Sequence, residues 1–360
     1  MRILGNNKGM ALLLTLSIIS LLVAFSLELN RKVRSAVFTV ASARDRTALH
    51  QMALSGIHAA MAVLVEDKMK SETDTLQEDW SDPEIIDEMM AAFPFEKGRV
   101  RVHITDELSK IQVNAVVKFP DKNTPNNPQM LLWERFLINH IAEDDHFEQI
   151  EPVTIINSLK DWIDSGDDDA ITGLTGAESD YYEDIESAYG CRNGRIPHLS
   201  DLVWIRGVSR ELYYGVGEST GISEYLTVHG IQIIGDSDFA YPGRININTA
   251  RLPVLTALMP IGSEDFAQAL VDYREEMSGD EYVNDISNPT WYTDVPGISA
   301  LDGQELAEFQ GLITTASDIY RIEAEAEHGD SRQVLNVVVQ REQDRESGKW
   351  KCRILSLESL

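Results

Sequence analysis

The sequence is poor in cysteine and in positive charge. Only two of its 360 residues are cysteines, Cys191 and Cys352, which is too few for a disulfide scaffold and forms no paired CxxC metal motif. The 31 Lys and Arg residues face 59 Asp and Glu residues, so the formal net charge is -28. Because phosphate binding needs clustered positive charge, this balance argues against nucleic acid as a partner.

Recognisable catalytic motifs are also absent from the sequence. It has no G-x-S-x-G elbow, no Walker loop, no HExxH pair and no glycine-rich dinucleotide fingerprint. The eight histidines are scattered, and His140 and His146 stand six residues apart, so they do not share a helical face. We therefore expect a protein that is not an enzyme.

Positive charge is concentrated at the start of the chain. Residues 1–66 carry a net charge of +4, whereas the remainder carries -32. Within that basic part, residues 10–27 form the only long uncharged apolar run, just long enough to cross a bilayer. Residues 10–65 contain no proline and a single glycine, Gly56, which predicts one helix over residues 10–66 with its first third in the membrane.

The remainder of the chain shows strand patterns at its two ends. Period-two alternation marks RVRVHI near residue 100 and KIQVNAVV over 110–117, and three more such runs close the chain. About 190 residues of mostly helical pattern lie between these groups. The sequence therefore predicts an α+β fold: a long N-terminal transmembrane helix, a small antiparallel sheet and a large inserted α-helical domain. The expected divisions are 1–9 (leader), 10–66 (helix), 67–118 (first part of the α/β domain), 119–316 (insertion) and 317–360 (C-terminal strands).

The predicted insertion contains a weak internal repeat. Residues 110–115 (KIQVNA) are similar to residues 244–250 (RININTA), and a leucine-rich stretch follows each. Together with glycine-containing turns, these units resemble helix-hairpin-helix modules that bind DNA phosphates, so a membrane-tethered DNA-binding protein is one alternative. Glu264 and Asp265 directly follow one such turn, however, and only Arg206 and Arg210 offer positive charge near another. We therefore expect these units to act as packing scaffold or protein contact surface.

The beginning of the chain resembles the type IV pilin and pseudopilin class. A short basic leader, MRILGNNKG, ends at Gly9, and the apolar run starts at Met10. The resemblance implies that a prepilin peptidase cuts after Gly9 and methylates Met10; an uncleaved signal anchor is the alternative interpretation. Most of the class has a glutamate five residues into the mature chain, where this sequence has Leu14. That departure is shared by the K-type minor pseudopilin of type II secretion.

Several internal sequence segments resemble segments of the same K-type pseudopilin family and occur in the same order. They are DELSKIQVNAV, DWIDSGDDD, GAESDYY, LSDLVWIRGVS and GRININTARLPVL. The resemblance implies a single-pass inner-membrane protein with a periplasmic body, at the tip of the filament that exports folded proteins across the outer membrane. The implied partners are the I-type and J-type minor pseudopilins, the major pseudopilin and the prepilin peptidase. A minor pilin of a type IV pilus is the other filament alternative.

The membrane orientation carries a conflict. Arg31, Lys32, Arg34, Arg44 and Arg46 follow the apolar run, whereas only Arg2 and Lys8 precede it. Counting these flanking charges would place the C-terminal side in the cytoplasm. The periplasmic placement therefore comes from the family resemblance alone.

One acidic segment is a candidate metal site. Its spacing does not fit an EF-hand, because Ile171 and Thr172 stand where a ligand and a glycine are needed. A solvated acidic loop is the alternative, whereas the resemblance to the K-type family implies calcium bound here. The candidate ligands are Asp161, Asp164, Asp167, Asp168, Asp169, Glu178 and Asp180. In the periplasm, Cys191 and Cys352 could also form a disulfide if the fold brought them together.

Overall fold

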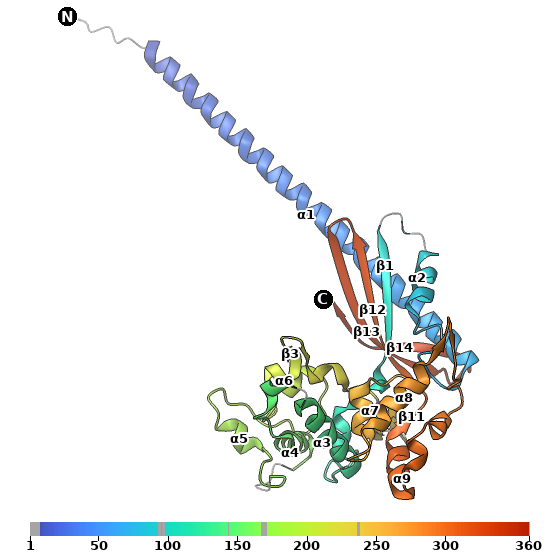
Figure 1. The fold of residues 1–360 in the computed structure, drawn as a ribbon. Helices are drawn as coiled ribbons and strands as arrows, with labels where there is room; N and C mark the ends of the chain where they lie inside the picture. The colour runs from blue at the N-terminus through green and yellow to red at the C-terminus, as the bar shows by residue number, and fades with distance from the viewer. Residues whose placement is uncertain are drawn as a thin grey trace, which may run out of the picture.

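A single long helix, α1 (Lys8–Lys70), carries the rest of the molecule at its C-terminal half (Figure 1). The computed structural model describes residues 8–359 except 93–94, 96–97, 143, 167–170 and 236–237. The most apolar 18-residue window of α1 has a mean hydropathy of 2.5 and is fully exposed, and α1 is the one helix in the described chain that is long and apolar enough to cross a membrane. The prediction of one continuous N-terminal helix is confirmed.

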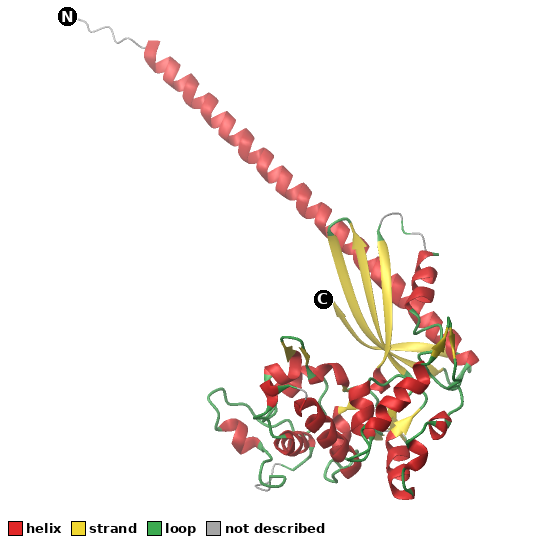
Figure 2. Cartoon of the chain, viewed as in Figure 1, coloured by secondary structure: helices red, strands yellow, loops and turns green. Residues whose placement is uncertain are grey.

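Four antiparallel strands form the main sheet, in the order β1 (Arg99–Asp106), β12 (Ile319–His328), β13 (Ser331–Gln343) and β14 (Trp350–Ser359). The neighbours β1 and β12 pair from Arg99 opposite Glu327 to Asp106 opposite Tyr320, although residues 107–318 separate them in the chain. The inserted segment therefore leaves and re-enters the sheet at one end, and it forms a separate helical body there (Figure 2). The strand predicted near residue 100 and the three predicted at the end of the chain are confirmed.

The sheet buries one face against α1, since successive side chains of a strand point to opposite faces. Ala53, Ile57 and Leu64 on α1 meet Ile322 and Val337 of the sheet in one continuous core. A short helix, α2 (Pro83–Ala91), contacts β1 at the edge of the sheet opposite β14. This packing fixes the direction in which α1 projects from the body.

Gly56 marks the closest approach of α1 to β1. A Cβ atom at this position would lie 2.7 Å from Val100 Cγ1 and 2.9 Å from Val102 Cγ2. We expect Gly56→Ala to lower the free energy of unfolding by about 1–3 kcal/mol, because the two buried valines would have to shift. Denaturant unfolding of the full chain in detergent micelles measures this effect. Gly311→Ala is the matched control, since that helical glycine has open space around its Cα and should gain slightly in stability.

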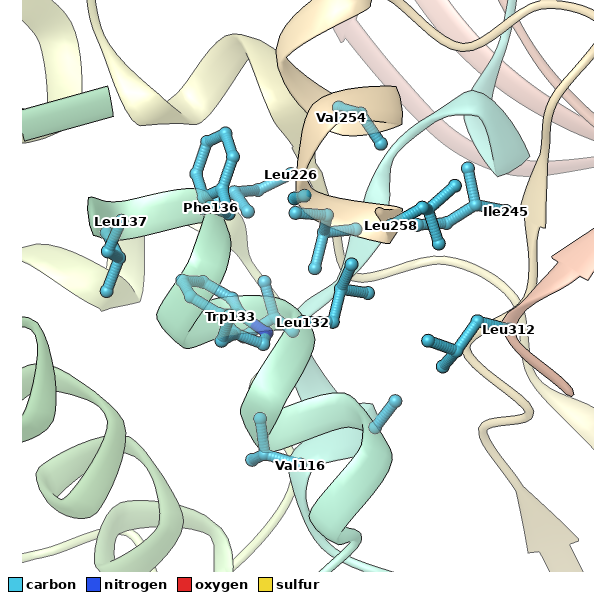
Figure 3. Packing of buried hydrophobic residues seen from close by; sticks show 14 of the residues in the cluster. Val116, Leu132, Trp133, Phe136, Leu137, Leu226, Ile245, Val254, Leu258 and Leu312 are labelled. Carbon is cyan, nitrogen blue, oxygen red and sulfur yellow. The ribbon is translucent and has the colours of Figure 1, made fainter. Parts of the chain in front are cut away.

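The helical body consists of short elements around its own hydrophobic core. Its helices are α3 (Asn127–Ala142), α4 (Pro152–Ile163), α5 (Ser179–Glu183), α6 (Arg210–Tyr214), α7 (Leu252–Leu258), α8 (Asp265–Glu275) and α9 (Gly303–Leu312). Figure 3 shows Trp133 and Phe136 of α3 in the same cluster as Val254 and Leu258 of α7. The second predicted leucine-rich helix therefore packs against the first.

The remaining strands are short pairs within the body and its connections to the sheet. They are β2 (Ile111–Gln112) with β5 (Leu226–Thr227), β3 (Gly215–Val216) with β4 (Ser219–Thr220), β6 (Gln232–Ile234) with β7 (Asp238–Ala240), β8 (Ile245–Asn246) with β11 (Ile313–Thr314), and β9 (Met277–Ser278) with β10 (Glu281–Tyr282). None of these pairs extends the main sheet.

The strand predicted over residues 110–117 is wrong. Only Ile111 and Gln112 form a strand, and Val113–Val116 form a 3₁₀ turn whose side chains lie buried in the helical body. The Gln112 side chain accepts a hydrogen bond from the backbone N–H of Asn114 (2.9 Å), which turns the chain out of the strand. An alternating apolar pattern cannot distinguish this buried turn from a strand.

The weak sequence repeat corresponds to a repeated local structure. In both copies a two-residue strand in a parallel pair ends in an amide residue, whose side-chain oxygen accepts a hydrogen bond from the backbone N–H two residues further on. Gln112 accepts from Asn114, and Asn246 accepts from Asn248. The two asparagines then donate to backbone carbonyls of distant segments, at 3.0 Å for Asn114 and 3.1 Å for Asn248. The helix-hairpin-helix character of these units stays a prediction.

Candidate functional site

The predicted processing residues lie at the start of α1. Gly9 and Met10 are in its first turns and are exposed, and Leu14 follows one turn later with 59% of its surface exposed. An exposed leucine here suits contact with lipid or with an apolar partner helix. Cleavage after Gly9, methylation of Met10 and the role of Leu14 stay predictions.

Three of the predicted metal ligands converge in the helical body. Asp161 and Asp164 lie at the C-terminal end of α4, and Glu178 directly precedes α5; one carboxylate oxygen from each lies within 4.8 Å of the others. All three are buried, at 0%, 7% and 6% exposure respectively. Asp180 instead lies on α5 with its side chain exposed. Asp167, Asp168 and Asp169 lie outside the described residues.

The loop between α4 and α5 is shaped around the Asp161 carboxylate. The backbone N–H of Thr172 donates to its two oxygens at 3.2 and 3.0 Å, and the Thr172 hydroxyl donates to Oδ1 as well. A Cβ atom on Gly176 would lie 2.0 Å from Asp161 Oδ2, so only glycine leaves room for the carboxylate. The chain therefore returns over the end of α4 through Thr172 and Gly176.

Lys160 provides the nearest positive charge to this cluster. Its Nζ atom lies 2.6 Å from Asp164 Oδ2 and 3.6 Å from Asp161 Oδ1. Burial raises the pKa of Asp164, and the Lys160 ammonium opposes that shift without cancelling it. Asp161 and Asp164 thus share this ammonium. A buried donor set made of carboxylate oxygens fits a hard divalent cation such as calcium.

Cys191 and Cys352 do not form the suggested disulfide with each other. Cys191 packs against the core of the helical body, and its sulfur lies 3.5 Å from the Asp161 carbonyl oxygen. Cys352 lies on β14, packs against the core between α1 and the sheet, and its sulfur is 3.6 Å from the Met61 carbonyl oxygen. The two residues belong to different cores, which the sequence did not reveal.

A second buried charge cluster joins α1, the sheet and the body. The Arg341 guanidinium on β13 donates to Asp67 Oδ2 (3.0 Å) and the Leu64 carbonyl oxygen (3.0 Å) on α1, to the Ser317 carbonyl oxygen (2.6 Å), and to the Asp74 carboxylate. Asp74 also accepts from the Tyr320 hydroxyl (2.5 Å) and from the Ser317 backbone N–H (2.8 Å). Arg341 and Asp74 are almost fully buried.

Sequence reasoning missed this cluster, although a signal was present. Val337, Val339 and Arg341 alternate along β13, and the period of two places all three on the face that packs against α1. A charged residue in phase with buried valines needs a buried partner. That partner could not be named, because Asp74 lies in an irregular segment far along the chain.

The pKa values of the carboxyls in this cluster reflect their burial. Desolvation, with the nearby charges of Glu78 and Asp74, raises the pKa of Asp67 to about 7 despite the opposing effect of Arg341. Burial likewise raises the pKa of Glu78. The cluster is therefore rich in acid relative to its one central guanidinium.

This architecture defines a class of protein. A long apolar N-terminal helix whose second half packs on a small antiparallel sheet is the arrangement of single-pass, pilin-like proteins, here with a helical body inserted between two neighbouring strands. Two models of the type II secretion system protein K family match residues 109–216 and 245–308. Both matches lie in the helical body, and the chain is similar there to the type II secretion system protein K family. The apolar helix α1 and this similarity fit a pseudopilin with a single N-terminal membrane anchor.

Relatives and a solved structure agree with this assignment. A type II secretion system protein K from Aeromonas hydrophila is 22% identical over 93% of each chain. Another from Pectobacterium carotovorum subsp. carotovorum is 26% identical, over 58% of this chain and 61% of that relative. The crystal structure of the GspK-GspI-GspJ complex from enterotoxigenic Escherichia coli contains a chain with the same fold, with a TM-score of 0.63, 14% identity and coverage of 89% of this chain and 99% of that one.

Proposed function

We propose that this protein is the minor pseudopilin at the tip of the type II secretion pseudopilus, where it initiates and caps the filament that exports folded proteins. The observation that carries the proposal is the helical body at the far end of the sheet from the exposed part of α1 (Figure 1). Such a body is difficult to accommodate along the side of a filament of packed helices, but it fits at the end.

The residue at position 14 supports a terminal place in the filament. In most pilin-like chains a glutamate here can neutralise the N-terminal ammonium of a neighbouring subunit, and Leu14 cannot. An unpaired charge among packed apolar helices costs several kcal/mol. A subunit with Leu14 should therefore join poorly beneath an existing subunit, but it can start a filament.

The proposed partners follow from the family. The neighbour structure is a GspK-GspI-GspJ complex, and we propose the I-type and J-type minor pseudopilins as partners here, followed by the major pseudopilin. The body would lie in the periplasm, and the prepilin peptidase would cut between Gly9 and Met10. No enzymatic step is assigned to the protein.

A deletion strain tests the filament proposal. Removing the gene should abolish or strongly impair export of folded proteins, because no other subunit would start the filament, and the wild-type gene should restore it. Secreted protein in the culture medium is the measurement. Normal export without the gene would contradict the proposal.

A processing variant serves as the matched control in the same strain. Gly9→Val should keep residues 1–9, as intact mass shows, and should not restore export; the wild-type product should begin at methylated Met10. Export restored by an unprocessed chain would refute the pilin-like assembly route while leaving the membrane anchor intact.

We also propose that Asp161, Asp164 and Glu178 hold a calcium ion. Carboxylate oxygens are the ligands that calcium takes, and bound calcium would add positive charge beside the Lys160 ammonium. We expect chelation to lower the melting temperature of the full chain by about 5 °C, the shift given by a ligand at roughly a hundred times its Kd. Differential scanning fluorimetry with EGTA and with added calcium measures it.

Two aspartate variants make the calcium test specific. Asp161→Asn should remove the response to calcium, whereas Asp180→Asn, an exposed carboxylate outside the cluster, should keep it. An unchanged melting temperature on adding calcium to the chelated wild type would overturn the calcium proposal.

A further inference from the structure

A ring of basic side chains surrounds α1 immediately after its apolar run. Arg31, Lys32 and Arg34 are all exposed and lie on one helix. At about 100° per residue, they point roughly 0°, 100° and 300° around the helix axis. Positive charge therefore surrounds the helix on several sides instead of lying on one face. A partner helix would meet one face, whereas a lipid layer surrounds the helix.

Two of these charges are available for a ligand. Arg31 is paired with Glu28, with Nε 3.3 Å from Oε2. For Lys32 and Arg34, in contrast, the described part of the chain supplies no carboxylate within ion-pair distance.

The depth of the ring matches the headgroup layer of a bilayer. The apolar residues 10–27 span about 27 Å as helix, close to the roughly 30 Å of a hydrocarbon core. Lys32 and Arg34 then lie one to two turns beyond its boundary, within reach of lipid phosphates for long basic side chains. The helix α1 contains no Trp or Tyr, the aromatic residues that usually anchor a span at this level.

We propose that Lys32 and Arg34, with Arg31, form a basic collar that binds the phosphates of anionic phospholipids in the leaflet adjoining the body. The collar sets the depth of α1 in the membrane and resists its movement along the bilayer normal. The collar gives a role to the basic residues after the apolar run, whose number would by itself place the body in the cytoplasm. Lipid binding by the collar does not depend on which side of the membrane the body occupies. The proposal depends on α1 as a membrane anchor and not on the place of the protein in the filament.

Native mass spectrometry of the full chain in maltoside micelles tests the collar, with phosphatidylglycerol and phosphatidylcholine as the probes. The wild type should retain phosphatidylglycerol in clear preference to phosphatidylcholine. Lys32→Gln combined with Arg34→Gln should reduce that preference about tenfold. Both positions are exposed and glutamine is a good helix former, so helicity by circular dichroism should be unchanged.

The matched control removes two charges from the same helix further from the membrane. Arg44→Gln combined with Arg46→Gln lies about 15 Å beyond the collar and should leave the lipid preference intact. Loss of preference in both variants, or no preference in the wild type, would overturn the proposal. Competition by soluble glycerol 3-phosphate equal to that by the lipid would also overturn it, because the site would then bind free phosphate and not a membrane lipid.

Discussion

Replacing Arg341 with methionine is expected to lower the free energy of unfolding by about 3–5 kcal/mol. The substitution keeps an unbranched apolar stem but removes the guanidinium, so that Asp67 and Asp74 stay buried with Lys68 as the nearest remaining cation, its Nζ 3.8 Å from Asp74 Oδ2. It also removes donors to the Leu64 and Ser317 carbonyl oxygens. Urea unfolding of the full chain in maltoside micelles measures the loss. Trp80, stacked edge-on against Tyr320 at 5.2 Å, reports on this core by fluorescence.

A neighbouring ion pair provides the control for Arg341. Arg353 on β14 pairs with Glu342 at 3.0 Å, but both side chains are substantially exposed. Arg353→Met should therefore cost no more than about 1 kcal/mol. Adding Asp74→Asn to Arg341→Met should recover part of the loss, because it removes one of the uncompensated charges. If Arg341→Met and Arg353→Met lowered the free energy of unfolding equally, the buried charges around Arg341 would not depend on its guanidinium, and the prediction would be wrong.

For Arg341, the sequence predicts that the side chain is buried but not which residue pairs with it. The alternation in β12, β13 and β14 predicts each strand and assigns each residue to a face, because the pleat has a period of two. It therefore places Arg341 on the buried face. It does not name Asp74, because the partner depends on how residues 71–82 cross the end of α1, and that path has no periodic signal.

The acidic cluster could be predicted as a set of residues but not as a geometry. Asp161 and Asp164 stand three apart on α4, so helical spacing alone brings them to neighbouring positions. Glu178 joins them only because the intervening loop folds back through Thr172 and Gly176. The need for glycine at position 176, where a Cβ atom would collide with the Asp161 carboxylate, is visible only in the structure.

Stability should rise as the pH falls from 8 to 5, because buried carboxyls take up protons in the folded state. In the folded protein the pKa of Asp67 is raised from 3.8 to about 7, first by desolvation and then by the charges of Glu78 and Asp74. Burial raises the pKa of Asp106 from 3.8 to about 6 as well. The folded state therefore binds protons that the unfolded state has released. Their stabilisation is complete below pH 3.8 and is lost as the pH rises through 6 and 7.

One buried carboxyl acts in the opposite direction at lower pH. Despite its burial, Lys110 and Arg321 hold the pKa of Glu107 at about 2, below its usual 4.5. Its contribution is present above pH 4.5 and is lost as the pH falls towards 2. The two trends together place the maximum of stability near pH 4. Between pH 5 and pH 8 we expect the free energy of unfolding to fall by roughly 4 kcal/mol.

The variant Asp67→Asn tests whether Asp67 is the group responsible for the loss of stability above pH 6. The amide oxygen can still accept from Arg341, so the ion-pair geometry is kept while the titrating proton is removed. Urea unfolding at several pH values should then show a flat profile between pH 6.5 and 8, with stability at pH 8 equal to or above that of the wild type. Asp87→Asn, on the exposed face of α2, should keep the wild-type slope. If Asp67→Asn keeps that slope too, the proton released above pH 6 comes from another group, and the cluster around Arg341 holds Asp67 ionised throughout.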